Sequence, residues 1–209
     1  MNRTVFLLLN CCLLFSCHEK RTGGNIAEIR IPAIHVNITD TSLRIVNGVQ
    51  YFGNTLFSGT IESFFPSGDI ETSRSFYRGR QEGWSATWYP SGVKADLRYY
   101  HLGEKDSVHT GWWSNGRLRF RYHFSRGNYD GISNEWYSSG KLLKEIVYVN
   151  GNDVSGKGWR ENGKPFMNFI MRDGRRYGLM NGQLCYSLKS EKGQYLPALS
   201  DTSGRRRPG

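Results

Sequence analysis

The side chains that most often carry catalysis are few in this chain, and their spacing does not describe a site. The histidines are His18, His35, His101, His109 and His123, and none has metal-ligand spacing to another histidine or to a cysteine. Cys185 would need a histidine base nearby in space to act as a nucleophile, and nothing in the sequence indicates one. The serine-hydrolase elbow and the phosphate-binding loop motif are also missing. We therefore expect no enzyme activity, no metal and no cofactor.

Aromatic side chains occur in adjacent pairs that repeat along the middle of the chain. The first members are Phe64, Trp88, Trp112, Trp136 and Trp159. The second members are Phe65, Tyr89, Trp113 and Tyr137, with Arg160 in the fifth place. Such rows either pack across strands, stabilising a sheet by about 0.2–1 kcal/mol per pair, or stay exposed and bind a peptide, glycan or lipid. We expect the first row to be structural and the second to be a binding surface.

A basic stripe follows the third aromatic pair. Arg117, Arg119 and Arg121 alternate with apolar residues, and His123 continues the series. One interpretation is an ordinary solvated face. The other is a contact with anionic lipid headgroups or with an acidic partner, to which each basic residue would contribute about 1 kcal/mol.

A repeated element must position these side chains, because glycines recur in register with the aromatic pairs. They are Gly68, Gly92, Gly116, Gly140 and Gly163, at intervals of 24, 24, 24 and 23 residues. Each ends a segment such as FFPSG, WYPSG or WWSNG, which is rich in turn-forming residues. In residues 118–124, apolar and basic residues then alternate with a period of two, which indicates a strand with one solvent-exposed face. Each repeat has room for two short strands and two turns.

The second repeat is out of phase with the third. In it, apolar residues such as Ala95 and Leu97 alternate against Lys94, Asp96 and Arg98. This pattern predicts either a local bulge or a second, partly covered face of the sheet, and the sequence leaves both interpretations open.

The segment GWSATWYPSG (83–92), followed by an alternating strand, resembles the MORN repeat. More closely, it is similar to the MORN-variant repeat of bacterial proteins often labelled antitoxins by homology. The resemblance covers residues 48–185. It implies an all-β fold, in which antiparallel β-hairpins stack into an elongated, open-ended sheet. An incomplete sixth unit near residues 173–182 predicts a terminal cap, as repeat arrays require.

The first residues resemble a bacterial lipoprotein signal. An apolar stretch, too short to span a bilayer, precedes Leu14-Phe15-Ser16-Cys17 and a polar segment. The resemblance implies that residues 1–16 are a signal peptide and that Cys17 becomes the acylated N-terminus. The alternative is an ordinary cleaved signal or a buried apolar segment.

The remaining chain divides by composition. Residues 17–27 predict a tether, residues 28–57 capping strands, residues 58–185 the repeats, and residues 186–209 a disordered basic tail. The formal net charge is +10, with 25 glycines and 14% aromatic residues. A fully disordered chain would be poor in aromatics, and a polytopic membrane protein would contain longer apolar runs.

These features predict a membrane-anchored binding protein at the bacterial cell envelope, facing the periplasm or the cell surface. The leading hypothesis is a scaffold that binds an envelope protein. One alternative is binding of anionic lipid or envelope glycan through the aromatic row and the basic stripe. Another is an antitoxin-like protein that binds a toxin. Nucleic acid is a poor partner for an exported chain, and open sheet edges would allow a homodimer.

Overall fold

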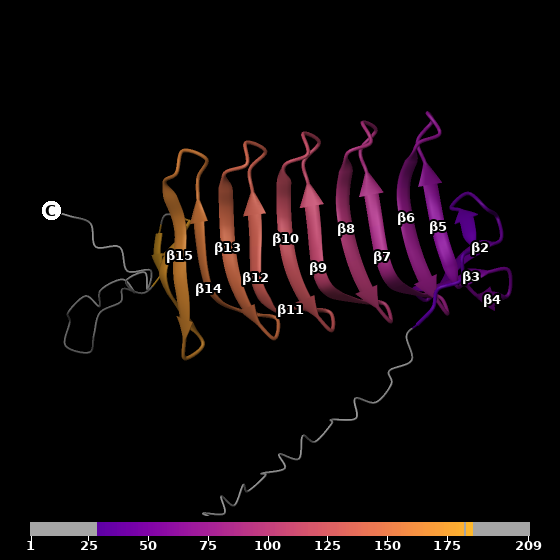
Figure 1. Cartoon of the computed structure of the whole chain (residues 1–209). Helices are drawn as coiled ribbons and strands as arrows, with labels where there is room; N and C mark the ends of the chain where they lie inside the picture. The colour runs from indigo at the N-terminus through magenta and orange to yellow at the C-terminus, as the bar shows by residue number, and fades with distance from the viewer. Residues whose placement is uncertain (1–28, 182, 186–209) are drawn as a thin grey trace, which may run out of the picture.

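The computed structural model describes residues 29–181 and 183–185, and the regular elements in them are all β-strands. Hairpins stand side by side in one long row (Figure 1). The fold is therefore all-β, as the sequence predicts. The predicted signal peptide, Cys17, the predicted tether and the predicted basic tail lie outside the described residues.

One large sheet contains most of the strands, and a small sheet lies at its N-terminal end. The strands are β1 (His35–Asn37), β2 (Leu43–Val46), β3 (Val49–Phe52), β4 (Thr55–Leu56), β5 (Gly59–Phe64), β6 (Ile70–Tyr77), β7 (Arg80–Trp88), β8 (Lys94–His101), β9 (Glu104–Trp112), β10 (Leu118–Ser125), β11 (Asn128–Tyr129), β12 (Gly131–Trp136), β13 (Leu142–Val149), β14 (Asn152–Trp159), β15 (Pro165–Arg172), β16 (Arg175–Met180) and β17 (Gln183–Cys185). The large sheet runs β1-β5-β6-β7-β8-β9-β10-β12-β13-β14-β15-β16-β17, and β11 pairs with β10. All its pairings are antiparallel except β1 with β5.

The aromatic pairs lie at one end of the strands, where the predicted turns occur. In the turn after β7, Tyr89 N donates to Val93 O at 2.8 Å, and Gly92 N donates to Tyr89 O at 2.9 Å. The five repeat glycines in these turns have φ between 79° and 90°, which explains why glycine occupies them. The strand register shifts beside each of these five turns, so a bulge is a shared feature of the repeats.

A second set of turns joins the strands at their opposite ends. Each has two residues with positive φ, the geometry of a tight hairpin turn that matches strand twist. The main set is Arg78–Gly79, Leu102–Gly103, Arg126–Gly127, Asn150–Gly151 and Asp173–Gly174. The glycine N–H reaches back to the previous hairpin: Gly103 N donates to Gln81 O, and Gly127 N donates to Lys105 O, both at 2.8 Å. These turns therefore fasten neighbouring hairpins together.

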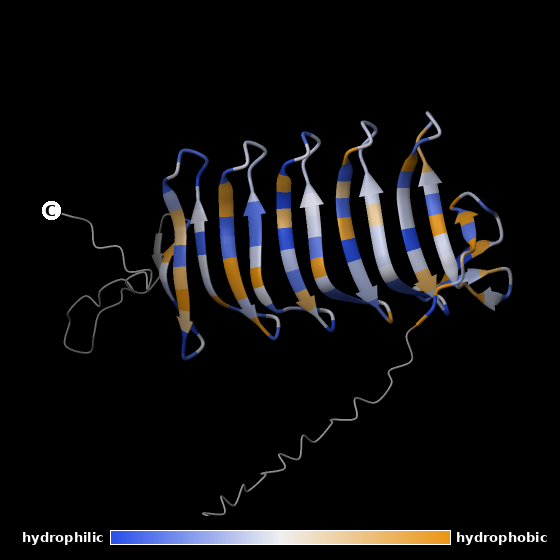
Figure 2. Cartoon of the chain, in the orientation of Figure 1, coloured by the Kyte–Doolittle hydropathy of each residue, from blue (hydrophilic) through white to orange (hydrophobic). Residues whose placement is uncertain are grey.

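The two faces of the large sheet differ in burial. We call the more buried face, which carries Phe120, Phe124 and Phe169, the inner face, and the opposite one the outer face. One cross-strand row on the inner face passes through Thr87, Asp96, Gly111, Phe120, Glu135, Lys144, Gly158 and Met167. Because successive residues point to opposite faces, hydrophobic and hydrophilic residues alternate as orange and blue bands along β8 and β10 (Figure 2).

The phase change in the second repeat has a structural explanation. Asp96 of β8 and Phe120 of β10 both pair with Gly111 of β9, so they lie in one row on the inner face. The bulge recurs in other repeats and cannot by itself distinguish the second one. The inner face therefore changes from polar at β8 to aromatic at β10, while Ala95 and Leu97 lie half-buried on the outer face.

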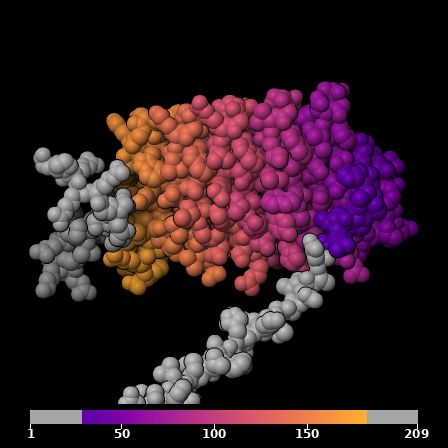
Figure 3. Space-filling model, viewed as in Figure 1, coloured from indigo at the N-terminus to yellow at the C-terminus, as the bar shows by residue number. Residues whose placement is uncertain are grey.

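The small sheet β2-β3-β4 lies at the N-terminal end of the row (Figure 3). Gln50 N donates to Gly79 O at 2.8 Å, which joins β3 to the first tight turn of the large sheet. Phe57 is buried between the two sheets, with its ring centroid 6.2 Å from Phe52 and 6.1 Å from Phe76. Residues 43–57 thus cover the end of the large sheet.

Candidate binding surface

The first predicted aromatic row ends five strands of the large sheet. Trp88, Trp112, Trp136 and Trp159 are half-buried, and Phe64 is exposed at 45% of its surface. Lys94 Nζ lies 6.0 Å from the centroid of the Trp88 ring. These side chains lie at the ends of their strands, next to the aromatic turns.

The second predicted row ties successive repeats together. A polar atom of each of three of its half-buried side chains donates to the backbone carbonyl of the next tryptophan in the first row. The bonds are Tyr89 Oη to Trp112 O at 3.0 Å, Trp113 Nε1 to Trp136 O at 3.0 Å and Tyr137 Oη to Trp159 O at 3.1 Å. Phe65 carries no polar atom for such a bond. Side chains of the second row thus join successive hairpins through hydrogen bonds.

The predicted basic stripe does not form a uniform set of free charges. Arg117 donates to the backbone carbonyl of Ser139 in the next turn. The Arg119 guanidinium carbon lies 5.7 Å from the centroid of the Trp113 ring. Arg121 is exposed, and its side chain has no hydrogen bond or ion pair within the described residues. Of the three, Arg121 is therefore the one most accessible to an anionic surface.

A connected series of rings crosses the inner face, away from the turns. We call it the inner aromatic path. Its members are Tyr100, His109, Phe124, Tyr129 and Tyr148, and successive centroids lie 5.5, 4.6, 4.4 and 4.7 Å apart. The three tyrosines are half-buried, while His109 and Phe124 lie beneath the surface. The path therefore forms a connected row of tilted rings across five strands, in which the three tyrosines are partly exposed.

A polar cluster lies beside the path. Tyr122 Oη donates to Glu135 Oε1 at 2.6 Å, and Lys144 Nζ lies 2.9 Å from the same carboxylate oxygen. Burial, and then the hydrogen bond to Glu135, raise the pKa of Tyr122 well above its usual value. The Tyr122 phenol therefore stays protonated and holds the Glu135 carboxylate in place.

At the N-terminal end of the inner face, a cleft opens against the small sheet. Its volume is about 650 Å³. We call it the arginine cleft, because Arg44 lines it from the small sheet, and Arg74, Arg80 and Arg98 line it from the large sheet. The walls also include Phe76 and Tyr100, and Tyr100 is the first member of the inner aromatic path.

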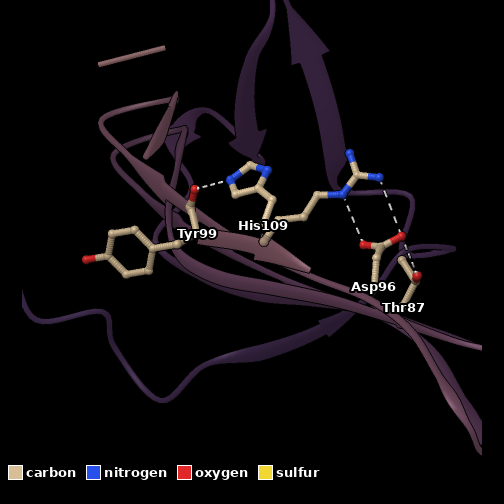
Figure 4. A network of polar contacts seen from close by, with 5 residues as sticks. Thr87, Asp96, Tyr99 and His109 are labelled. Carbon is tan, nitrogen blue, oxygen red and sulfur yellow. Dashed lines mark hydrogen bonds and ion pairs between the residues drawn. The ribbon is translucent and has the colours of Figure 1, made fainter. Parts of the chain in front are cut away.

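Asp96 is the only acidic residue that lines the cleft within the described part of the chain. Arg98 Nε donates to Asp96 Oδ1 at 3.1 Å, and Thr87 Oγ1 donates to Asp96 Oδ2 at 2.9 Å (Figure 4). Burial alone would lower the pKa of Arg98, but Asp96 and Tyr100 outweigh this effect and raise it. Asp96 and Arg98 therefore form a fixed ion pair in the wall.

The inner aromatic path left a signal in the sequence that the turn motifs obscured. Three of its members, Tyr100, Phe124 and Tyr148, recur at intervals of 24 residues, and Phe76 of the arginine cleft precedes Tyr100 by the same interval. Gly79, Gly103, Gly127 and Gly151 recur at the same interval and mark the tight turns. A search for further series at the repeat period would have found both. The cleft leaves no such signal, because it joins a repeat face to segments outside the repeats.

The described residues hold no group of three or more His, Cys, Asp or Glu side chains arranged to bind a metal ion. Within residues 29–181 and 183–185 there is also no helix with the length and apolar character needed to cross a membrane. No known family model and no curated protein matches the sequence of this chain.

Proposed function

We propose that this chain is a non-catalytic binding protein of the bacterial cell envelope. In this proposal it is a MORN-like repeat lipoprotein, acylated at Cys17, whose sheet holds a segment of a partner protein. The observation that carries the proposal is the inner aromatic path: Tyr100, Tyr129 and Tyr148 stay half-exposed on the inner face.

The chemistry of the path favours a protein partner. Tyrosine offers a large, stiff contact area at a low cost in conformational entropy, and aromatic residues are enriched in protein interfaces. The small sheet lies at the β5–β6 end, and no second layer of described residues covers β10 to β15. An extended segment of a partner would bury the exposed ring surfaces, which stabilises a complex through the hydrophobic effect.

Co-purification with matched variants tests this proposal. The full chain, extracted in detergent, is expected to retain a stoichiometric envelope protein at high salt, and Tyr148→Ser should release it. Trp84→Ser is the control, because Trp84 is 51% exposed on the outer face and lies outside the path. Circular dichroism must show that both variants fold. Equal retention of the partner by both variants would contradict a role for the inner face.

Anionic lipid is a second candidate partner, and the exposure of Arg121 favours it. The Arg121 side chain points from the outer face and has no partner in the described residues. Flotation with anionic vesicles, using Cys17→Ser chain so that acylation does not contribute, should then fall with rising salt and with Arg121→Gln. Flotation that neither change affects would count against this candidate.

A further inference from the structure

The arginine cleft carries more positive charge than its own residues compensate. Four arginines and one aspartate line it, which leaves a formal charge of +3. Asp96 neutralises Arg98 through their ion pair. The nearby buried acid Glu82 is also committed, since it accepts from His101 Nδ1 at 3.1 Å and from Leu102 N at 2.7 Å. Three arginines therefore lack a negative partner in the wall.

The uncompensated arginines come from both sides of the cleft. Arg74 and Arg80 are exposed, and their side chains make no hydrogen bond or ion pair within the described residues. Arg44 donates to the neutral oxygens of Gly53 and Asn54, so its charge also remains. Guanidinium groups bind carboxylates and phosphates through paired N–H donors, which makes them the usual side chains for recognising such anions.

The rest of the wall limits what else the ligand contains. Ile61, Phe76 and Tyr100 line the cleft from the large sheet, and Ile38 and Ile45 line it from the N-terminal segment. Such apolar and aromatic surface suits a hydrocarbon or ring portion of a ligand. Ser85 lines the cleft as well; it is 7% exposed, and its hydroxyl makes no hydrogen bond within the part of the chain described. This hydroxyl is available to a polar group of a ligand.

We infer that the arginine cleft binds a small organic anion, with a carboxylate or phosphate between Arg44, Arg74 and Arg80 and an apolar or aromatic body against Phe76 and Tyr100. The volume of about 650 Å³ lies within the range of small-molecule sites, about 300–1,000 Å³. The cleft shares Tyr100 with the inner aromatic path, but Arg44, Arg74 and Arg80 lie outside the path. Arg74→Gln therefore tests the cleft, and Tyr148→Ser tests the proposed protein contact.

Calorimetric titration of the full chain in non-ionic detergent tests the inference. The probes are phenyl phosphate and phthalate, with benzyl alcohol as an uncharged aromatic of similar size. We expect both anions to bind at low salt and the alcohol not to bind. Arg74→Gln should weaken binding by about tenfold or more, as expected for loss of a charge-assisted contact.

The matched control is Arg175→Gln, which removes one exposed positive charge at the far end of the sheet. It should leave the affinity for phenyl phosphate unchanged. Equal weakening by Arg74→Gln and Arg175→Gln would overturn the inference, because it would show attraction to net charge only. Absence of binding by both anions, with anionic vesicles bound instead, would also overturn it. Arg74 has no partner to lose, so its variant is expected to fold.

Discussion

At the scale of single residues, one glycine decides how an aromatic side chain fits the inner face. Gly111 and Phe120 are cross-strand partners, and the Phe120 ring occupies the space where a side chain at position 111 would lie. A Cβ atom at Gly111 would lie 2.2 Å from Phe120 Cε1. Gly156 and Phe169 repeat the arrangement, with a corresponding distance of 2.5 Å. The glycines therefore make room for the buried rings.

Gly111→Ala should consequently destabilise the protein. We expect a loss of about 1–3 kcal/mol in the free energy of unfolding, the usual cost of overpacking a close-packed interior. Urea unfolding followed by tryptophan fluorescence measures it. Adding Phe120→Leu should recover part of the loss, because the smaller side chain leaves space for the methyl group. Strictly additive losses in the double variant would contradict this packing.

His109 makes stability depend on pH. It is 2% exposed, and its Nε2 atom donates to Tyr99 O at 2.8 Å (Figure 4). Burial, reinforced by Arg98 and Lys105, lowers the pKa of His109 below its usual value of ~6.5. His123 shifts in the same direction, through burial and Arg121.

The unfolded chain therefore binds more protons than the folded chain just below pH ~6.5. The free energy of unfolding should fall as the pH drops from ~6.5 toward the lowered pKa values of His109 and His123, and it should level off below them. His109→Gln should reduce this slope, while His123→Gln removes the remaining share. Urea titrations at several pH values measure it, and an unchanged slope in the double variant would contradict the assignment.

At the scale of the elements, neighbouring hairpins are joined at both ends of their strands. The tight turns donate backward through glycine N–H groups, and the aromatic turns donate forward through Tyr89, Trp113 and Tyr137. In a repeat protein, stability depends on such contacts between adjacent units. The turn aromatics therefore contribute to the cooperativity of the whole array.

Tyr137→Phe tests one of these junctions. It removes only the hydroxyl that donates to Trp159 O, so we expect a loss of about 0.5–1.5 kcal/mol. Hydrogen exchange should accelerate mainly in β14 to β16, the units beyond the junction. Tyr77→Phe is the control, because no hydrogen bond of its hydroxyl is found within the described residues. Acceleration spread evenly along the sheet would contradict a local junction.

The hairpins could be predicted from sequence because each turn leaves a local signal. Gly92 and Gly116 follow turn-forming residues, and residues 119–124 alternate with the faces of the sheet as expected. The two interpretations of the second repeat could not be separated, because the inner face at Asp96 is polar although it is covered. The alternation along a strand shows only which positions are polar. The burial of Asp96 depends instead on Arg98 and Thr87, which lie on the same face and contact it.

At the scale of the molecule, the cleft could not be predicted because it joins distant segments. Arg44 and Arg98 are 54 positions apart and belong to different sheets. No spacing rule connects them, since residues 38–50 lie outside the repeats. The turn aromatics, in contrast, were visible in the sequence, but their hydrogen bonds to the next repeat were not.

The proposed membrane anchor is also a property of the whole molecule, and it rests on Cys17. Cells grown with labelled fatty acid should incorporate label into the wild-type chain but not into Cys17→Ser. The variant should also move from the membrane fraction to the soluble fraction. Cys185→Ser is the control and should keep both the label and the membrane fraction. Labelling that persists in Cys17→Ser would refute acylation at this residue.

The constant register between hairpins has a consequence for how such a gene can change. Successive tight-turn glycines from Gly79 to Gly151 are 24 residues apart, and each hairpin contacts mainly its two neighbours. Recombination that duplicates or deletes 24 codons within this stretch would leave every remaining strand with a partner of the same pairing pattern. Such a change between Gly103 and Gly151 would lengthen or shorten the aromatic face by whole hairpins and leave the arginine cleft intact, because the lining of the cleft ends at Gly103. Length and ligand chemistry are therefore free to evolve separately.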